Sequence, residues 1–131
     1  MTKVDLINEE FKLAAHRIIA RLIKLDPSLL EKARKKISTM EEKHGEVDFI
    51  LEWKEILSKD SIFDIQKELT SRDEDNYRLR ISSPFNTMSF PPFDSEAYRR
   101  RIWKAAKRLV EDRLNRLEGD KLCHDHRFGP R

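Results

Sequence analysis

The sequence has little of what a disulfide-stabilised or strand-rich protein needs. Its 131 residues include one cysteine, Cys123, and three glycines. A single cysteine excludes an intrachain disulfide framework and is typical of a reducing compartment. No stretch of four to eight residues alternates cleanly between apolar and polar side chains, so the sequence carries almost no strand signal. Few glycines, with 39% charged and 38% hydrophobic residues in regular spacing, favour helices whose outer faces are solvated.

Long apolar runs are missing as well. The N-terminal residues from Met1 to Asp5 hold no apolar signal core, and charges interrupt every apolar run well short of a membrane span. We therefore expect a cytoplasmic protein that has no membrane partner. A chain of this length is most economically one domain.

The motifs of common catalytic, metal and nucleotide sites are also absent. The chain contains no GxxxxGK[ST], HExxH, GxSxG or CxxC pair. Cys123, His124 and His126 are metal-ligating residue types, but zinc needs about four ligands held tetrahedrally, and neighbours in a tail rarely converge. Cys123 with His124 as its base would form a nucleophilic site only if a third residue oriented the histidine, and the tail offers none. We expect no metal, no other cofactor and no enzymatic activity.

Apolar spacing predicts an all-α protein, a compact bundle of five or six helices. Apolar residues recur at steps of three and four from Val4 to Leu25, and the stripe is wide enough for this first helix to be central in the core. Asp26-Pro27 ends that helix and begins the next, which Gly45 terminates. The predicted helices cover residues 4–25, 27–44, 46–58, 61–69, a short stretch from 73, and 95–118.

A loop over residues 82–94 separates the last two predicted helices. Its three prolines predict a stiff, irregular path. Its apolar side chains are too many to be left in water; they are Phe85, Met88, Phe90 and Phe93. They can fold back over the helical core, or insert into a partner, because aromatic and Met side chains dominate interface hot spots. The sequence leaves both interpretations open.

The last predicted helix is basic. Residues 95–131 hold 11 basic and 6 acidic residues, against 16 and 18 in residues 1–94. An apolar seam is predicted through Tyr98, Ile102, Ala105, Leu109 and Leu117, with Ala106, Val110 and Leu114 beside it. Gly119 is expected to end the helix and a mobile tail, residues 119–131, to follow.

The cations of this helix form a second candidate contact surface. They are Arg99, Arg100, Arg101, Lys104, Lys107 and Arg108. Four of them recur at helical steps and share one face. Such a face suits an acidic protein partner or nucleic-acid phosphates, and it is equally compatible with a solvated surface or a homodimer interface.

Two arginines and two serines close to the loop form a third candidate. Arg78 and Arg80 with Ser82 and Ser83 can clamp a carboxylate or a phosphate. The alternative is structural, with an arginine paired to Glu74 and the hydroxyls capping the end of the helix.

Residues 13–85 resemble a family of small helical bacterial proteins, antitoxin-like partners encoded beside a toxin gene. The resemblance rests on His16-Arg17, Ile19-Ala20, Asp26-Pro27, Leu30, Ala33-Arg34, Glu52-Trp53, Leu57, Arg78-Leu79-Arg80 and Ser82-Ser83-Pro84-Phe85. After Phe85 the chain departs from the pattern, since Asn86-Thr87-Met88-Ser89-Phe90 replaces a small, aliphatic continuation.

The resemblance implies a non-catalytic chain that neutralises a partner enzyme by masking its active site. Antitoxins of this type often also bind their own promoter, which the basic last helix would suit. We therefore expect a protein-binding module of antitoxin type, with the phenylalanine-containing loop and the last helix as contacts. The alternative is a nucleic-acid-binding protein that acts through the basic helix.

Overall fold

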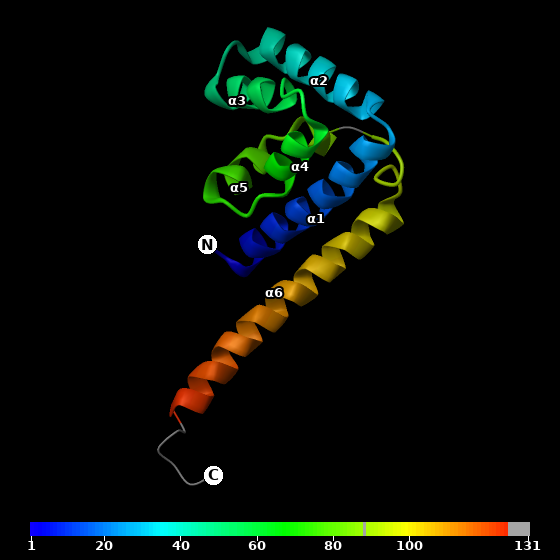
Figure 1. Ribbon diagram of the computed structural model, residues 1–131. Coiled ribbons are helices and arrows are strands. Elements are labelled where there is room, and N and C mark those ends of the chain that lie inside the picture. Colours follow the sequence, from blue (N-terminus) through cyan, green and yellow to red (C-terminus); the bar gives the residue numbers. More distant parts are fainter. Residues whose placement is uncertain (88, 126–131) are drawn as a thin grey trace.

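Six α-helices and one short 3-10 helix make up the protein, as the all-α prediction required (Figure 1). This computed structural model describes residues 1–87 and 89–125, with side chains described up to residue 119. The elements are α1 (Lys3–Leu25), α2 (Ser28–His44), α3 (Asp48–Leu57), α4 (Ile62–Thr70), α5 (Glu74–Ile81), η1 (Pro84–Thr87) and α6 (Glu96–Asp125). The described residues contain no strand.

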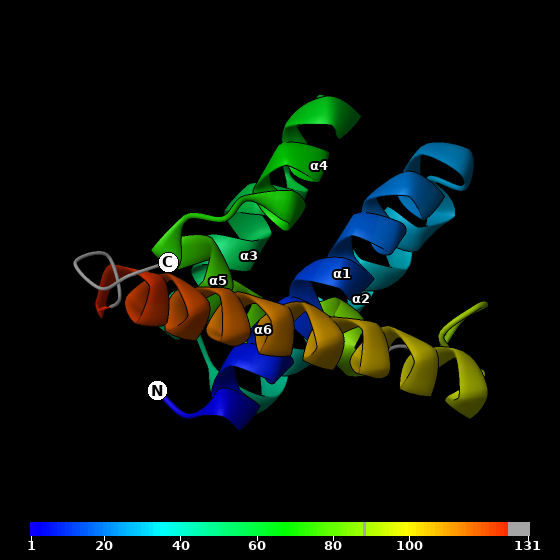
Figure 2. The same ribbon diagram turned by 90° about the horizontal axis from the view of Figure 1, so that it is seen from below.

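Helix α1 is central, as predicted, because it packs on both sides. One side faces α2, α4 and α5, and the other lies against α6, which crosses it obliquely (Figure 2). The buried face of α1 includes Ile19 and Ile23 of the wide predicted stripe and adds Leu13, whereas Val4 and Leu25 of the stripe are exposed. Val4 and Leu25 lie in the first and last turns of α1.

The main core lies between α1 and the four helices that follow it. Trp53 of α3 is at its centre, almost fully buried, and its Nε1–H donates to the carbonyl oxygen of Leu79 at 3.1 Å. This bond satisfies the one polar group of the indole inside an apolar core. A second, smaller cluster joins α1 to α6 through Ile7, Ala106 and Val110.

The helix ends follow local sequence signals. Thr2 and Asp5 form a capping box at the start of α1, with Asp5 N–H donating to Thr2 Oγ1 at 3.1 Å and Thr2 N–H to the Asp5 carboxylate at 3.0 Å. Ser61 caps α4, with the backbone N–H of Asp64 donating to its Oγ at 3.3 Å. Gly45 ends α2 with φ +79°, a backbone conformation that favours glycine.

Two predictions about the C-terminal third were wrong. Residues 82–94 are not wholly irregular, since Pro84 begins the 3-10 helix η1; proline is tolerated in the first turn of a helix, where its N–H is not needed. Gly119 does not end the last helix, because α6 continues to Asp125. Glycine inside a helix costs only about 1 kcal/mol, which neighbouring helix formers can offset. Residues 126–131 of the expected tail lie outside the described residues.

Candidate functional site

The C-terminal part of α6 extends beyond the body of the protein (Figure 1). A helix of 30 residues is about 45 Å long. The described ion pairs that hold α6 to α1 end at Arg113. We call residues 114–125 the α6 arm. Leu114 and Leu117 of the arm are 37% and 67% exposed. The arm therefore carries apolar side chains that the body of the protein does not cover.

The face of α6 that packs on α1 is not the predicted seam. Ala106 and Val110 are buried against α1, whereas Ala105 and Leu109 are exposed. Both stripes are apolar, and the one with Ala106 and Val110 packs against Ile7 of α1. Consequently Leu109 joins Leu114 and Leu117 as an exposed leucine of α6.

The predicted basic residues of α6 are at its surface, but most of them have a partner within the chain. Arg100 pairs with Glu96 at 2.7 Å, and Arg99 donates to the carbonyl oxygen of Phe93. Arg101 lies over the ring of Tyr98, and Lys107 over that of Trp103. Lys104 and Arg108, one turn apart, are exposed and have no ion pair among the described residues. Of the six cations predicted to contact an acidic partner or nucleic acid, these two therefore lack a described partner within the chain.

A groove runs between α1 and the segment that leads into α6, and it brings two of the predicted contact regions together. Its volume is about 260 Å³. Phe85 and Phe93 from the loop and Arg99 from the basic helix line it together with Phe11 and Lys12 of α1. An apolar floor with two cations suits an apolar side chain that has an acidic neighbour.

The aromatic residues of the loop lie mostly inside the protein. Phe85 and Phe90 are buried in the main core, and Phe93 is half-buried with its ring against those of Phe90 and Tyr98. Phe90 therefore cannot contact a partner without unpacking the core, and Phe85 is accessible only at the floor of the groove. Met88 lies outside the described residues. Of the four predicted contacts, Phe93 is the one described at an accessible surface.

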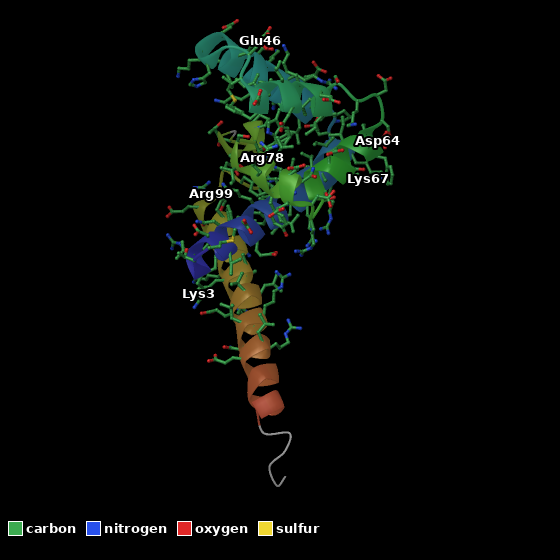
Figure 3. The ribbon with its side chains drawn as sticks, turned by 90° about the vertical axis from the view of Figure 1, so that its left-hand side faces the viewer. Lys3, Glu46, Asp64, Lys67, Arg78 and Arg99 are labelled. Atoms are coloured by element: carbon green, nitrogen blue, oxygen red, sulfur yellow. The ribbon has the colours of Figure 1, made fainter. Side chains whose placement is uncertain are left out.

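The structure separates the predicted clamp of Arg78, Arg80, Ser82 and Ser83. Arg78 pairs with Glu52 of α3 at 2.9 Å, rather than with Glu74; Figure 3 shows Arg78 in the helical body and Arg99 at the start of α6. Ser82 donates to the carbonyl oxygen of Leu79. Arg80 is buried, and Ser83 contacts His16. The four side chains thus have separate surroundings and do not form one site.

Glu10 is a buried acid that the sequence analysis did not single out. Its carboxylate accepts from Arg113 of α6 at 2.6 Å and from Arg72, which follows α4, at 3.1 Å. Burial alone would raise the pKa of Glu10, but these two hydrogen bonds outweigh it and the pKa is lowered. Glu10 therefore fastens α6 to the body. The sequence feature that could have revealed Glu10 is its position between Ile7 and Leu13, on the apolar face of a predicted helix.

His16 is a second buried polar residue that was missed as a site residue. Its Nδ1 lies 2.7 Å from the carbonyl oxygen of Lys12, and its Nε2 lies 2.7 Å from Ser83 Oγ. Burial lowers the pKa of His16 to about 4, so the ring is neutral at pH 7. Ser83 and His16 are both buried. The pair ties the segment before η1 to α1.

Other site classes find little support in the part of the chain that the structure describes. There, no three His, Cys, Asp or Glu side chains gather as metal ligands would. Cys123 and His124 lie in the last turns of α6, where side chains are not described, and His126 lies outside the described residues. Among the described helices, none has both the length and the apolar character that a membrane crossing requires.

Comparisons with known proteins give no relative from which a function can be inferred. No protein-family model matches the chain, and no significant match was found among curated proteins or solved structures. The function must therefore be argued from the molecule's own surfaces, among which the α6 arm and the groove at the other end of α6 are the candidates.

Proposed function

We propose that this protein is a non-catalytic binding module that holds a partner protein along α6, in the manner of an antitoxin that masks a toxin enzyme. The observation that carries the proposal is the α6 arm, which leaves the body and exposes Leu114 and Leu117. A helix gains little from standing alone in water, because most helical stability in proteins comes from packing an apolar face. A partner that covers these leucines supplies that packing.

The exposed charges of α6 indicate the chemistry of the proposed partner. Lys104 and Arg108 are exposed one turn apart, and Leu109 follows them. In helix-in-groove recognition, apolar residues three or four positions apart, such as Leu114 and Leu117, are the anchors. Charged residues beside the anchors add specificity. The proposed partner therefore has an apolar groove flanked by acidic side chains. The groove beside Phe93 and Arg99 extends the contact to the start of α6.

The test is affinity purification of the tagged chain from its own cells, with and without nuclease, read by mass spectrometry. We expect one stoichiometric protein that survives nuclease treatment and is lost from a Leu114→Ser, Leu117→Ser double variant. The matched control is Leu25→Ser with Phe63→Ser, since these side chains are 82% and 66% exposed elsewhere on the body. Circular dichroism should show unchanged helical content in both.

Two outcomes contradict the proposal. If the arm variant retains the partner as well as the control does, the arm is not the contact. If nucleic acid co-purifies without a protein and is released by salt, the basic face of α6 binds phosphates instead, and a Lys104→Glu, Arg108→Glu variant should abolish that retention.

A further inference from the structure

Arg80 is a buried cation whose hydrogen-bonding capacity is only partly used. Its side chain is 1% exposed. Nη1 donates to the carbonyl oxygen of Leu69 at 3.1 Å, but Nε and Nη2 have no hydrogen-bond partner among the described residues. Buried polar groups are nearly always paired, and a buried charge more so, because leaving one unpaired is costly. The two unpaired nitrogens of Arg80 therefore need an explanation.

The position of these two nitrogens indicates what kind of group would satisfy them. Nε–H and Nη2–H lie along one edge of the planar guanidinium group and point in parallel. Two oxygens of a carboxylate or a phosphate match this edge in a bidentate pair, which is among the strongest hydrogen-bonded arrangements in proteins. The remaining nitrogen, Nη1, is already held by α4 through Leu69. The guanidinium group is thus held through Nη1, while its bidentate edge has no hydrogen-bond partner among the described residues.

Among the described residues, no acid forms an ion pair with Arg80. Burial lowers its pKa, and the nearby cations Arg17 and Arg72 lower it further. Glu10 is the carboxylate that acts on Arg80, and it already accepts hydrogen bonds from Arg72 and Arg113. This part of the protein therefore holds more positive than negative charge around a buried guanidinium group.

Tyr77 covers Arg80 on one side. Its ring lies 4.5 Å from the guanidinium carbon, and its hydroxyl accepts from Arg72 at 2.9 Å. Tyr77 is only half-buried, so its outer side faces solvent.

We propose that Arg80 is an anion receptor that binds one oxyanion, a carboxylate or a phosphate group, through Nε and Nη2 beneath Tyr77. Arg72 and Arg17 add attraction for the anion. The site is separate from the α6 arm, so it can be tested on the isolated chain whether or not the partner proposal holds.

The experiment titrates the isolated, 15N-labelled full-length chain at pH 7 with sodium phosphate, and separately with sodium acetate. Sodium chloride keeps the ionic strength constant. We expect one of the two anions to shift the Arg80 Nε–H resonance saturably and to raise the Tm above its value in chloride. A response to acetate identifies a carboxylate as the ligand, and a response to phosphate identifies a phosphate group.

Variants separate this site from general salt effects. Arg80→Met keeps a side chain of similar length without the charge, so it should fold and lose the anion-dependent rise in Tm. Arg80→Lys keeps the charge but not the fork and should lose most of the rise. Arg78→Met is the control, and it should respond like the wild type. The proposal is overturned if neither anion shifts the Arg80 resonance, or if Arg80→Met retains the full rise in Tm.

Discussion

Ser83 Oγ lies 2.7 Å from Nε2 of His16, across 67 residues of sequence. The direction of this hydrogen bond follows from the other side of the ring. His16 Nδ1 lies 2.7 Å from the carbonyl oxygen of Lys12, which can only accept, so Nδ1 carries the proton and Nε2 accepts from the Ser83 hydroxyl. Ser83 Oγ also accepts from the backbone N–H of Phe85 at 3.2 Å. The neutral imidazole thus determines the path of the chain into η1.

The first prediction is a loss of stability between pH 7 and pH 4.5 that depends on His16. An unfolded imidazole binds a proton near pH 6.5, whereas burial keeps folded His16 neutral down to about pH 4. In this interval the unfolded state binds more protons, so the free energy of unfolding falls as the pH falls. We expect His16 to account for about 2 kcal/mol of that fall. Urea denaturation at the two pH values measures it.

The control for this prediction is His16→Gln, whose amide can still donate to Lys12 and accept from Ser83 but does not titrate. Carboxylates with lowered pKa values, such as Glu10 and Asp26, also lose stabilising interactions in acid, and they do so in both proteins. The difference between wild type and variant therefore isolates His16. Equal pH dependence in the two proteins would show that the ring is not a buried neutral group.

The second prediction concerns the attachment of α6. Glu10→Gln removes the charge that Arg113 and Arg72 share, and both arginines then lose a strong acceptor. Hydrogen bonds to charged groups contribute about 1.5–3 kcal/mol, and the two arginines are partly exposed, so we expect a loss of about 1–2 kcal/mol. Amide hydrogen exchange should increase most around Ala106 and Val110, which pack on α1.

Glu111→Gln is the matched control, because Glu111 pairs with Lys3 between the same two helices but at an exposed site. Solvent screens that pair, so its loss should have a smaller effect. If the two variants lose the same stability and show the same exchange, the buried position of Glu10 contributes nothing special to the attachment of α6.

Local sequence signals predicted the helices well because caps and breakers act within a few residues. Asp26-Pro27 and Gly45 mark boundaries that the structure confirms. The orientation of each helix was harder, since it depends on neighbours. α6 has two apolar stripes, through Leu109 and through Ala106, and only packing against α1 selects the second.

The candidate sites were predictable only in part for the same reason. The sequence shows an acid at position 10 and a histidine at position 16 on an apolar helix, but their partners come from distant segments. Arg113 is 103 residues from Glu10 along the chain. The phenylalanines of the loop were open to two interpretations, and the structure places Phe85 and Phe90 in the core.

The last prediction is that Gly119→Ala stiffens the α6 arm. Gly119 lies inside α6, and a Cβ there would meet no atom within 4 Å among the described residues. Alanine in a helix interior is favoured over glycine by about 1 kcal/mol, mainly because glycine loses more conformational freedom. We expect slower amide exchange in the arm. If the arm binds the proposed partner as a helix, affinity should also rise, because less ordering is needed on binding.

Gly45→Ala provides the opposite case. Its position is just as open, but its φ of +79° is unfavourable for alanine. This variant should therefore lose about 1 kcal/mol or more of stability. The two variants separate the effect of backbone conformation on stability from the effect of steric room, because both glycines have room for a Cβ and only Gly119 has a helical backbone. If Gly119→Ala exchanges as fast as wild type, the arm is not helical in solution at residue 119, and binding through a preformed helix loses its basis.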